Sequence, residues 1–334
     1  MDPAPAATTA ALEAARRAPS AHNSQPARFG VESETVGLGW EPRRLLPAGD
    51  PDRHYLFTGL GASAESLVLG AAGAGRRTQV TCADRPTEHE AATILISNGP
   101  ADPGDAELAG PLRARQTTRL PFLPDPVPAG HIAALMAEAE ARGCRLTVVD
   151  GAKAMSGFAG LVGEGTARNF ADAQVYEEFF SWLRLRLAHP QYDRDGLSAS
   201  ALNLGRLLTL AAPVGMTPTA MRAFGRARLL GVLAGTQRRL ARAASAACLL
   251  TAPSDDFGGR FNGGRAMLRV WARAPAMNLR VHPMTAPMDH VETRRALADL
   301  FGVAPDAAMV VSFRLGYGAL APRSPRLPLA ELLR

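Results

Sequence analysis

The sequence predicts an α+β fold in which two halves are joined in one chain. Its 334 residues are too many for a minimal domain and suit two domains or one large fused unit. Segments with helical periodicity alternate with short strand-like segments along the chain. Residues 101–110 contain Pro, Gly and Asp and interrupt this alternation. We therefore place a boundary there and predict halves of residues 1–110 and 111–334.

The first half is predicted to contain a helix at residues 9–17, followed by two short strands and a second helix. The second helix, residues 60–74, is rich in small side chains, which allow another backbone to approach closely. It therefore suits a central position in a fold of two halves. The strands of this half are predicted at residues 29–32, 36–40, 79–82 and 91–96.

The second half is predicted to contain four amphipathic or apolar helices and three strands. Residues 200–242 have no clear pattern and carry many arginines, so a loop with a solvated basic helix is the simplest interpretation. The helices are predicted at residues 128–143, 167–188, 260–275 and 291–302, and the strands at residues 145–149, 246–251 and 309–317.

Composition limits the classes of partner. The net charge is +6, from 37 Lys+Arg and 31 Asp+Glu, which permits nucleic-acid binding. However, zinc-ligand spacing, aromatic–basic interleaving and a recognition-helix pattern are missing, so we expect no nucleic-acid partner. We also find no signal peptide and no apolar run long enough to span a bilayer, which predicts a cytoplasmic protein with no membrane association. Cys82, Cys144 and Cys248 are far apart, so we expect buried thiols, with neither a disulfide framework nor a metal site.

The first informative stretch is residues 18–29, Ala-Pro-Ser-Ala-His-Asn-Ser-Gln-Pro-Ala-Arg-Phe. Pro19 and Ser20 signal a helix start, at which the hydroxyl group can accept a backbone N–H. The amides of Asn23 and Gln25 donate and accept hydrogen bonds, which suits the edge of a flat heterocycle such as a flavin pyrimidine. From the residues alone, an ordinary capped turn is equally compatible.

The second informative stretch contains Arg115, Thr117 and Arg119 at alternate positions. In an extended segment these three side chains project to one side. Two guanidinium groups that flank a hydroxyl group make a good phosphate-binding element. The alternative from composition alone is a solvated basic loop.

These stretches resemble motifs of the FMN-dependent nitroreductases. Residues 19–26 resemble the P-S-x-x-N-x-Q-P-W segment in the His-Asn form of the Acg-like branch, although Ala27 stands in the place of Trp. Residues 115–119 resemble the R-x-S-x-[RK] phosphate-binding element. Residues 314–317 and 323–328 resemble the R-x-G-Y strand and the closing R-R-P segment, for which Arg326 aligns well and Arg323 aligns with a small shift.

The resemblance implies a nitroreductase-like FMN fold, with an antiparallel-rich mixed sheet flanked by helices and two similar halves fused in one chain. The motif order is reversed relative to ordinary nitroreductases, which suits a pseudo-dimer with one FMN site in a monomer or homodimer. The resemblance assigns FMN binding to Ser20, His22, Asn23, Gln25, Arg115, Thr117, Arg119, Arg323 and Arg326.

The implied activity is that of an FMN-dependent oxidoreductase, which transfers hydride or electrons between NAD(P)H or a substrate and a small organic molecule. The chain shows no Ser/His/Asp triad, paired-carboxylate signature or GxGxxG, so we name no catalytic residue and disfavour a Rossmann dehydrogenase. His282 is interpreted as structural. Two alternatives stay open: a flavin-sequestering protein closed by a lid at residues 200–245, and a dehydrogenase or tailoring oxidase with extra room at Ala27.

Overall fold

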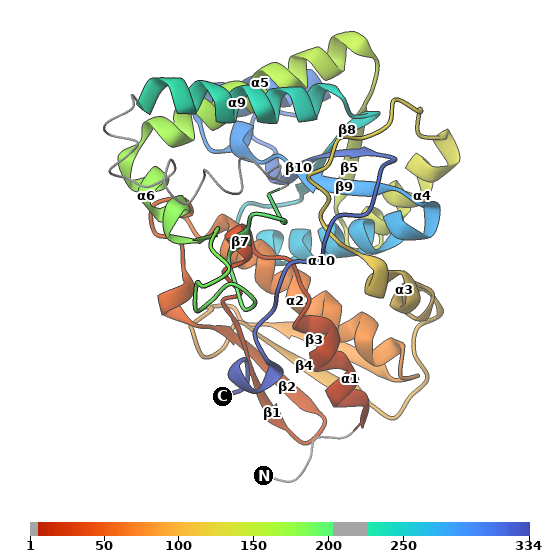
Figure 1. Cartoon of the computed structure of the whole chain (residues 1–334). Helices are drawn as coiled ribbons and strands as arrows, with labels where there is room; N and C mark the ends of the chain where they lie inside the picture. The colour runs from red at the N-terminus through yellow and green to blue at the C-terminus, as the bar shows by residue number, and fades with distance from the viewer. Residues whose placement is uncertain (1–5, 203–225) are drawn as a thin grey trace.

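Two antiparallel four-stranded sheets, with helices between and outside them, make up the fold (Figure 1). The structure is a computed structural model that describes residues 6–202 and 226–334. The first sheet has the order β1-β2-β4-β3 and the second the order β5-β8-β10-β9. The predicted α+β class is confirmed. The strands are β1 (Ala27–Glu32), β2 (Thr35–Trp40), β3 (Arg77–Cys82), β4 (Ala92–Ser97), β5 (Arg145–Val149), β8 (Ala246–Ala252), β9 (Arg280–Pro283) and β10 (Ala308–Gly316), with a short parallel pair, β6 (Leu183–Arg184) and β7 (Leu197–Ser198).

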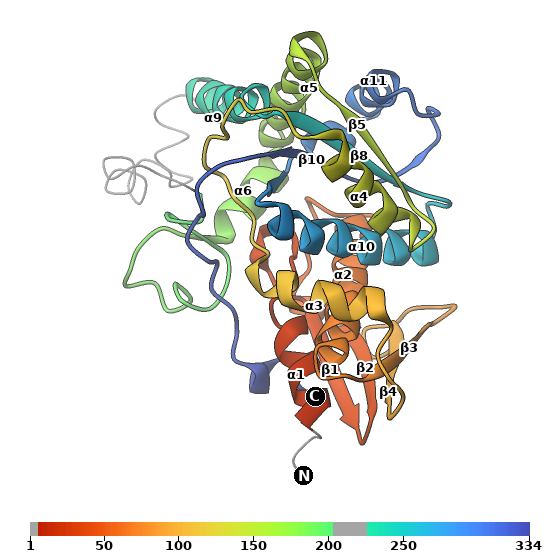
Figure 2. The same cartoon turned by 90° about the vertical axis from the view of Figure 1, so that its right-hand side faces the viewer.

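Helices α2 and α10 lie between the two sheets, and α5 and α9 cover the outer side of the second sheet (Figures 1 and 2). This layering explains the strand sequences. Residues 246–251 of β8 are all buried because helices cover both faces of its sheet, whereas β3 alternates between half-buried and exposed residues. The helices are α1 (Ala6–Ala15), α2 (His54–Ala72), α3 (Pro103–Ala114), α4 (Ala129–Glu140), α5 (Ala152–Ala171), α6 (Ala173–Ser181), α9 (Arg226–Arg242), α10 (Phe257–Arg273) and α11 (Val291–Phe301).

Glycines allow α2 and α10 to touch along their backbones. A Cβ added at Gly61 would lie 1.9 Å from the carbonyl oxygen of Phe261, and one added at Gly264 would lie 1.9 Å from that of Thr58. The close approach predicted for the small-residue helix is therefore confirmed. That helix starts at His54, before the predicted residue 60, because the Asp50 carboxylate accepts hydrogen bonds from backbone N–H groups of the first turn.

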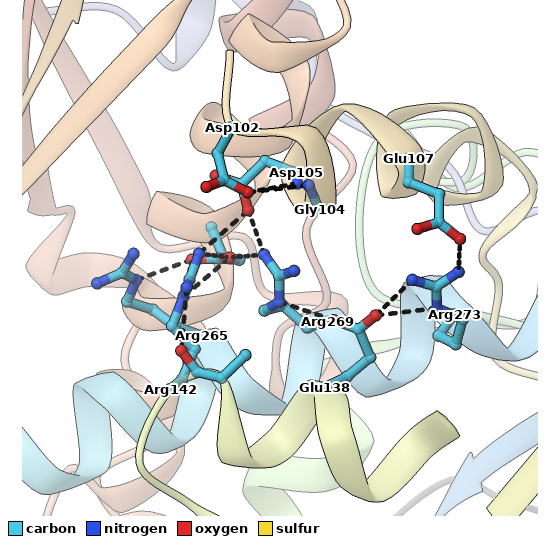
Figure 3. A network of polar contacts seen from close by, with 11 residues as sticks. Asp102, Gly104, Asp105, Glu107, Glu138, Arg142, Arg265, Arg269 and Arg273 are labelled. Atoms are coloured by element: carbon cyan, nitrogen blue, oxygen red, sulfur yellow. Dashed lines mark hydrogen bonds and ion pairs between the residues drawn. The ribbon is translucent and has the colours of Figure 1, made fainter. Parts of the chain in front are cut away.

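A network of ion pairs joins α2, α3, α4 and α10 (Figure 3). Its centre is Glu65, which is fully buried in α2 and accepts from Arg142 at 2.6 Å, Arg265 at 2.8 Å and Arg269 at 3.0 Å. Arg269 also pairs with Glu138 at 2.9 Å. A buried carboxylate needs this many donors because its desolvation is expensive. The network therefore fixes the packing of α2 against α10, α3 and α4.

Two predicted elements differ from the structure. Residues 101–110, expected to be a connection, form most of α3, because Asp102 caps its N-terminus and Leu108 is buried. The single helix predicted at residues 167–188 is replaced by the end of α5 and the separate helix α6, which is capped by the carboxylate of Asp172. Residues 152–166, for which no helix was predicted, form most of α5.

The chain returns to the first sheet after β10. Leu327 and Leu332 are buried in the core of that sheet. Phe29 of β1 donates its N–H to Leu332 at 2.8 Å, and Arg334 donates its N–H to Phe29 at 3.0 Å. Residues 327–334 therefore cover the edge strand of the sheet at the other end of the sequence.

Three further expectations concern the cysteines, membranes and the lid. Cys144 and Cys248 are buried as predicted, whereas Cys82 is half-buried, and all three are free thiols. Within residues 6–202 and 226–334, no helix has the length and apolar content needed to cross a membrane. Residues 203–225 of the predicted lid, residues 200–245, lie outside the described residues, and α9, which belongs to its last part, packs along α5.

Candidate functional site

The turn at residues 20–25 has an unusual backbone. His22, Asn23 and Gln25 adopt positive φ angles of 49°, 56° and 53°. Each such non-glycine residue costs roughly 1–2 kcal/mol, so the surrounding structure must hold this conformation in place. The Ser20 hydroxyl contributes to this, because it accepts the N–H of Gln25 at 3.0 Å. The predicted helix start is a single 3-10 turn, Ala21–Asn23.

The amides of Asn23 and Gln25 bind protein groups. Asn23 donates to the carbonyls of Gly196 and Pro325, both at 3.1 Å. Gln25 donates to the carbonyl of Arg194 at 2.9 Å and accepts the N–H of Leu327 at 2.9 Å. These amides tie the turn to residues 194–196 and 325–327. Their contact with a pyrimidine edge stays a prediction.

Residues 115–119 run extended beside β9. Thr117 forms a bridge with Val281, and Thr118 donates its N–H to the carbonyl of Val281 at 3.0 Å. Arg115, Thr117 and Arg119 consequently face the same cavity, while Thr118 is fully buried. The three residues therefore share one cavity, which Gln116 also lines.

Arg314 supports this segment from behind. It is fully buried in β10 and donates to the carbonyls of Leu120 at 2.8 Å and Thr118 at 3.4 Å. Its Nε atom donates to Nδ1 of His282 at 3.0 Å, so the imidazole accepts there. Burial, and then the positive charge of Arg314, hold the pKa of His282 well below its usual value. His282 is thus structural, as interpreted from the sequence.

One cavity brings together most of the residues that the resemblance assigned to FMN. We call it the arginine cavity, because five arginines line it. Among the described residues that line it there is no Asp or Glu. Segments from residues 17–23, 115–119 and 322–326 meet here, although the sequence separates them widely. Its lining is Arg17, Pro19, Ser20, Asn23, Arg115, Gln116, Thr117, Arg119, Leu197, Pro322, Arg323, Ser324 and Arg326.

Burial and mutual repulsion make the charged form of three of the cavity's arginines less favourable and lower their pKa values. Burial, followed by the charges of Arg17 and Arg323, lowers the pKa of Arg115 to about 10. Burial, followed by the charges of Arg115, Arg17 and Arg16, lowers the pKa of Arg326 to about 9. Burial alone lowers the pKa of Arg119 to about 10. All three remain protonated near pH 7, so the lowered pKa values express the cost of desolvated, mutually repelling cations.

The residues present fit a bound phosphate. Nη1 of Arg115 and Nε of Arg326 are buried and have no hydrogen-bond partner. Within the described part of the chain, the five arginines make no ion pair, and their side chains donate to backbone carbonyls and to Asn23. Unpaired buried donors on cations are costly unless an anion accepts from them. An oxyanion such as phosphate supplies both charge and acceptors.

Two of the nine predicted residues do not line the cavity. Gln25 lies behind it, and His22 packs edge-on against the ring of Phe179, with centroids 5.3 Å apart. Burial, and then the charge of Arg119, lower the pKa of His22 to about 4. The sequence interpretation missed Arg17, which lies at the end of the helix predicted at residues 9–17. Its position directly before the Ala18-Pro19-Ser20 motif was the available signal.

Comparison with known proteins gives relatives along almost the whole chain. The Putative NAD(P)H nitroreductase Rv3131 of Mycobacterium tuberculosis is 27% identical over 334 residues, which cover 96% of this chain and 89% of that protein. The Putative NAD(P)H nitroreductase acg of the same species is 36% identical over 121 residues, which cover 35% of this chain and 36% of that protein. No protein-family model matches the chain.

Among solved structures, the FMN-dependent nitroreductase NfnB of Mycobacterium smegmatis, in complex with NADPH, is 19% identical, with a TM-score of 0.40 over 69% of this chain and 98% of that chain. The sequence relatives agree with the resemblance of the motifs. The chain is thus similar in sequence to putative NAD(P)H nitroreductases, Acg among them.

Proposed function

We propose that the protein is an FMN-dependent oxidoreductase that uses NAD(P)H as reductant and acts on a small organic molecule. One observation carries this proposal: a cavity lined by five arginines and no described acid, with two buried guanidinium nitrogens that lack partners. The curated relatives are named as NAD(P)H nitroreductases, and the M. smegmatis structure as FMN-dependent, which supports the same cofactor and reductant here.

In this proposal, Arg115, Arg326 and the hydroxyl group of Thr117 hold the FMN phosphate. Arg119 lies deeper, beside His22, His282 and Arg314, whose pKa values its charge lowers. With FMN bound, Arg119 would add positive charge to the inner part of the site. When bound, FMN supplies hydride or electron transfer, and the protein supplies binding and electrostatics. Ser20, His22, Asn23 and Gln25 support the site, mainly by shaping the turn at residues 20–25.

We further propose that residues 1–110 and 111–334 are the two fused halves of a pseudo-dimer with one FMN site. The pairing of two four-stranded sheets across α2 and α10 supports this view. A monomer would then contain a complete site, although a homodimer is equally compatible. Three free cysteines are compatible with the reducing cytoplasm, which we propose as the location.

The test is reconstitution of the purified protein with FMN, followed by anaerobic titration with NADPH and NADH. We expect a bound yellow flavin whose absorption band bleaches when a nicotinamide nucleotide is added. FMN at 100 times its Kd should also stabilise the fold by about 2.7 kcal/mol, which calorimetry can detect.

A protein that takes up no FMN would refute the proposed cofactor. A protein that binds FMN but is reduced by neither nucleotide would refute the proposed reductant, and would favour flavin sequestration or an oxidase. A binding-deficient variant, Arg115→Ala, is the control that separates specific binding from adsorption.

A further inference from the structure

The first sheet has one face that is open to solvent. Helices α1 and α2 pack on its other face, and in the described part of the chain no helix covers the open one (Figure 2). Side chains alternate between the two faces along each strand, so the residues between the core positions point outward. The outward residues, which we call the open face, are Gly30 and Glu32 of β1, Thr35 and Gly37 of β2, Thr93, Leu95 and Ser97 of β4, and Arg77, Gln79 and Thr81 of β3.

The strand registers arrange the open face in rows across the sheet. One row runs in the order Glu32, Thr35, Leu95, Gln79. Arg77 lies two residues before Gln79 on β3 and is therefore next to this row. Because β1 and β3 are the outermost strands, Glu32 and Arg77 lie at opposite edges of the sheet, near the same end. The neighbouring row on the other side is Gly30, Gly37, Thr93, Thr81.

The two charges and the apolar side chain of the open face lack partners within the chain. Leu95 is 42% exposed near the centre of the face. Glu32 and Arg77 are exposed, and the described residues offer neither side chain an ion pair or a hydrogen bond. Such features are ordinary on a surface when they occur singly. Here, opposite charges flank an exposed apolar centre on one sheet face.

The arrangement of these residues is self-complementary. The strand order β1-β2-β4-β3 places the middle of the sheet between β2 and β4. A two-fold axis above this line and parallel to the strands would set β1 of one copy over β3 of another. Glu32 of each copy would then face Gln79 and Arg77 of the other, while Leu95 would lie over Thr35. Sheets that pack face to face are about 10 Å apart, a gap that Glu and Arg side chains can bridge together.

We propose that the open face is a self-association surface, on which a second copy of the chain packs sheet against sheet. The symmetric match of Glu32 with Arg77 favours a second copy over an unrelated protein, because each copy supplies both charges. The face shares no residue with the described lining of the arginine cavity, so this proposal goes beyond the proposed function and does not depend on FMN.

The area of the open face sets the strength of the association. Four strands about 4.8 Å apart, with rows about 6.8 Å apart, give roughly 400–500 Å² per copy. Complexes that bury less than about 1,200 Å² in total are weak and transient. We therefore expect a dimer that forms at high protein concentration and dissociates on dilution.

The experiment is sedimentation equilibrium of the purified full-length chain between about 1 and 500 μM, the range in which weak complexes dissociate. It compares the wild type with Glu32→Arg, Arg77→Glu and the charge-swapped double variant Glu32→Arg/Arg77→Glu. A fourth variant, Leu95→Arg, places a charge at the centre of the face. The control Glu140→Arg makes the same change of charge at an exposed residue of α4. Circular dichroism and thermal unfolding check that each variant folds.

We expect each single charge variant to raise the Kd of the dimer at least about tenfold, because like charges then meet twice in the symmetric interface. The charge-swapped variant should return to within about threefold of the wild type, since it recreates both pairs in reverse. Leu95→Arg should weaken the dimer as strongly as the single charge variants, and Glu140→Arg should leave it unchanged.

The charge-swapped variant also has the net charge of the wild type, so a second control is needed. Glu140→Arg/Arg77→Glu has this net charge without the matched pair and should stay as weak as Arg77→Glu alone. Recovery in this control would overturn the proposal, because net charge would then explain the effect.

Three further results would overturn the proposal. They are a wild type that stays monomeric over the whole concentration range, a charge-swapped variant that does not recover, and a dimer that none of the variants weakens, which would use another surface. Failure of the protein to bind FMN would refute the proposed function and leave this measurement unaffected.

Discussion

Nη1 of Arg326 donates to Oδ1 of Asn23 over 2.7 Å and joins positions that are 303 residues apart. The same Asn23 amide donates to the carbonyl of Pro325, next to Arg326. The turn at residues 20–25 and the segment at residues 322–326 therefore hold each other in place at the arginine cavity. This mutual support explains why a motif near one end of the sequence and a motif near the other end belong to one site.

Replacement of arginines in the arginine cavity should weaken FMN binding. Charge-assisted hydrogen bonds contribute about 1.5–3 kcal/mol, so Arg326→Ala or Arg119→Ala should raise the Kd for FMN about 10- to 100-fold. Arg326→Lys should have an intermediate effect, because Lys keeps the charge but loses the forked geometry. Fluorescence titration with FMN measures these values, with Arg43→Ala as control, because the Arg43 side chain is 89% exposed and pairs with Glu41, away from the cavity. Unchanged Kd values in both alanine variants would contradict the placement of FMN in the arginine cavity.

The stability of the apoprotein should depend on pH through His22. Its folded pKa of about 4 lies below the unfolded value of 6.5. Between these values the unfolded chain binds a proton that the folded chain does not, so the free energy of unfolding decreases as pH falls. The decrease attributable to this half-buried residue is about 1–3 kcal/mol. Urea unfolding at pH 7, 6 and 5 should show a smaller decrease in His22→Gln than in the wild type or in His89→Gln, which changes an exposed residue.

The contact between α2 and α10 should not accept a methyl group at Gly61. The added Cβ would lie 1.9 Å from a backbone oxygen, which cannot move aside as a flexible side chain could. We expect Gly61→Ala to lower the free energy of unfolding by about 3 kcal/mol or more. Gly160→Ala, in α5, has open space around the new Cβ and should be neutral or stabilising by up to about 1 kcal/mol. Equal stabilities of the two variants in denaturant unfolding would count against this close contact.

Loss of the Glu65 charge should destabilise the crossing of the helices. Glu65→Gln leaves three arginines around a neutral group in a buried place, and breaking a buried ion pair typically costs about 3–5 kcal/mol. The matched control is Glu164→Gln, which removes a partly exposed pair with Arg168 at 2.9 Å and should cost about 0.5 kcal/mol. Chemical denaturation gives both values. A cost below about 1 kcal/mol for Glu65→Gln would mean that the network adds little to stability.

The sequence predicted those parts of the site that depend on local geometry. Alternation of residues 115, 117 and 119 in an extended segment predicts that they share one side, and in the structure all three line the same cavity, together with Gln116. The orientation of the Asn23 and Gln25 amides depended on residues 194–196 and 325–327, and no local pattern specifies such distant partners. Arg17 was missed for the same reason, because its place in the cavity is fixed by segments far along the chain.

Helices and strands with strong hydrophobic periodicity were predicted from the sequence. A helix that contains turn-forming residues was not predicted. Helix α3 contains Pro103, Gly104 and Pro111, which are typical of loops. A proline in the first turn of a helix loses no hydrogen bond, and Asp102 supplies the cap. Leu108 is buried against Leu69 of α2 and Ala272 of α10, and this packing favours the helix. This packing is tertiary information that a local pattern cannot contain.

The return of residues 327–334 to the edge of the first sheet has a consequence for biosynthesis. The arginine cavity needs residues 322–326, and β1 needs residues 332–334 along its free edge. Both are synthesised long after the turn at residues 20–25 and β1. A growing chain consequently exposes an unpaired strand edge and an unfinished anion site until residues 322–334 have been made. A chain truncated before residue 322 would therefore lack one wall of the arginine cavity and the cover of its edge strand.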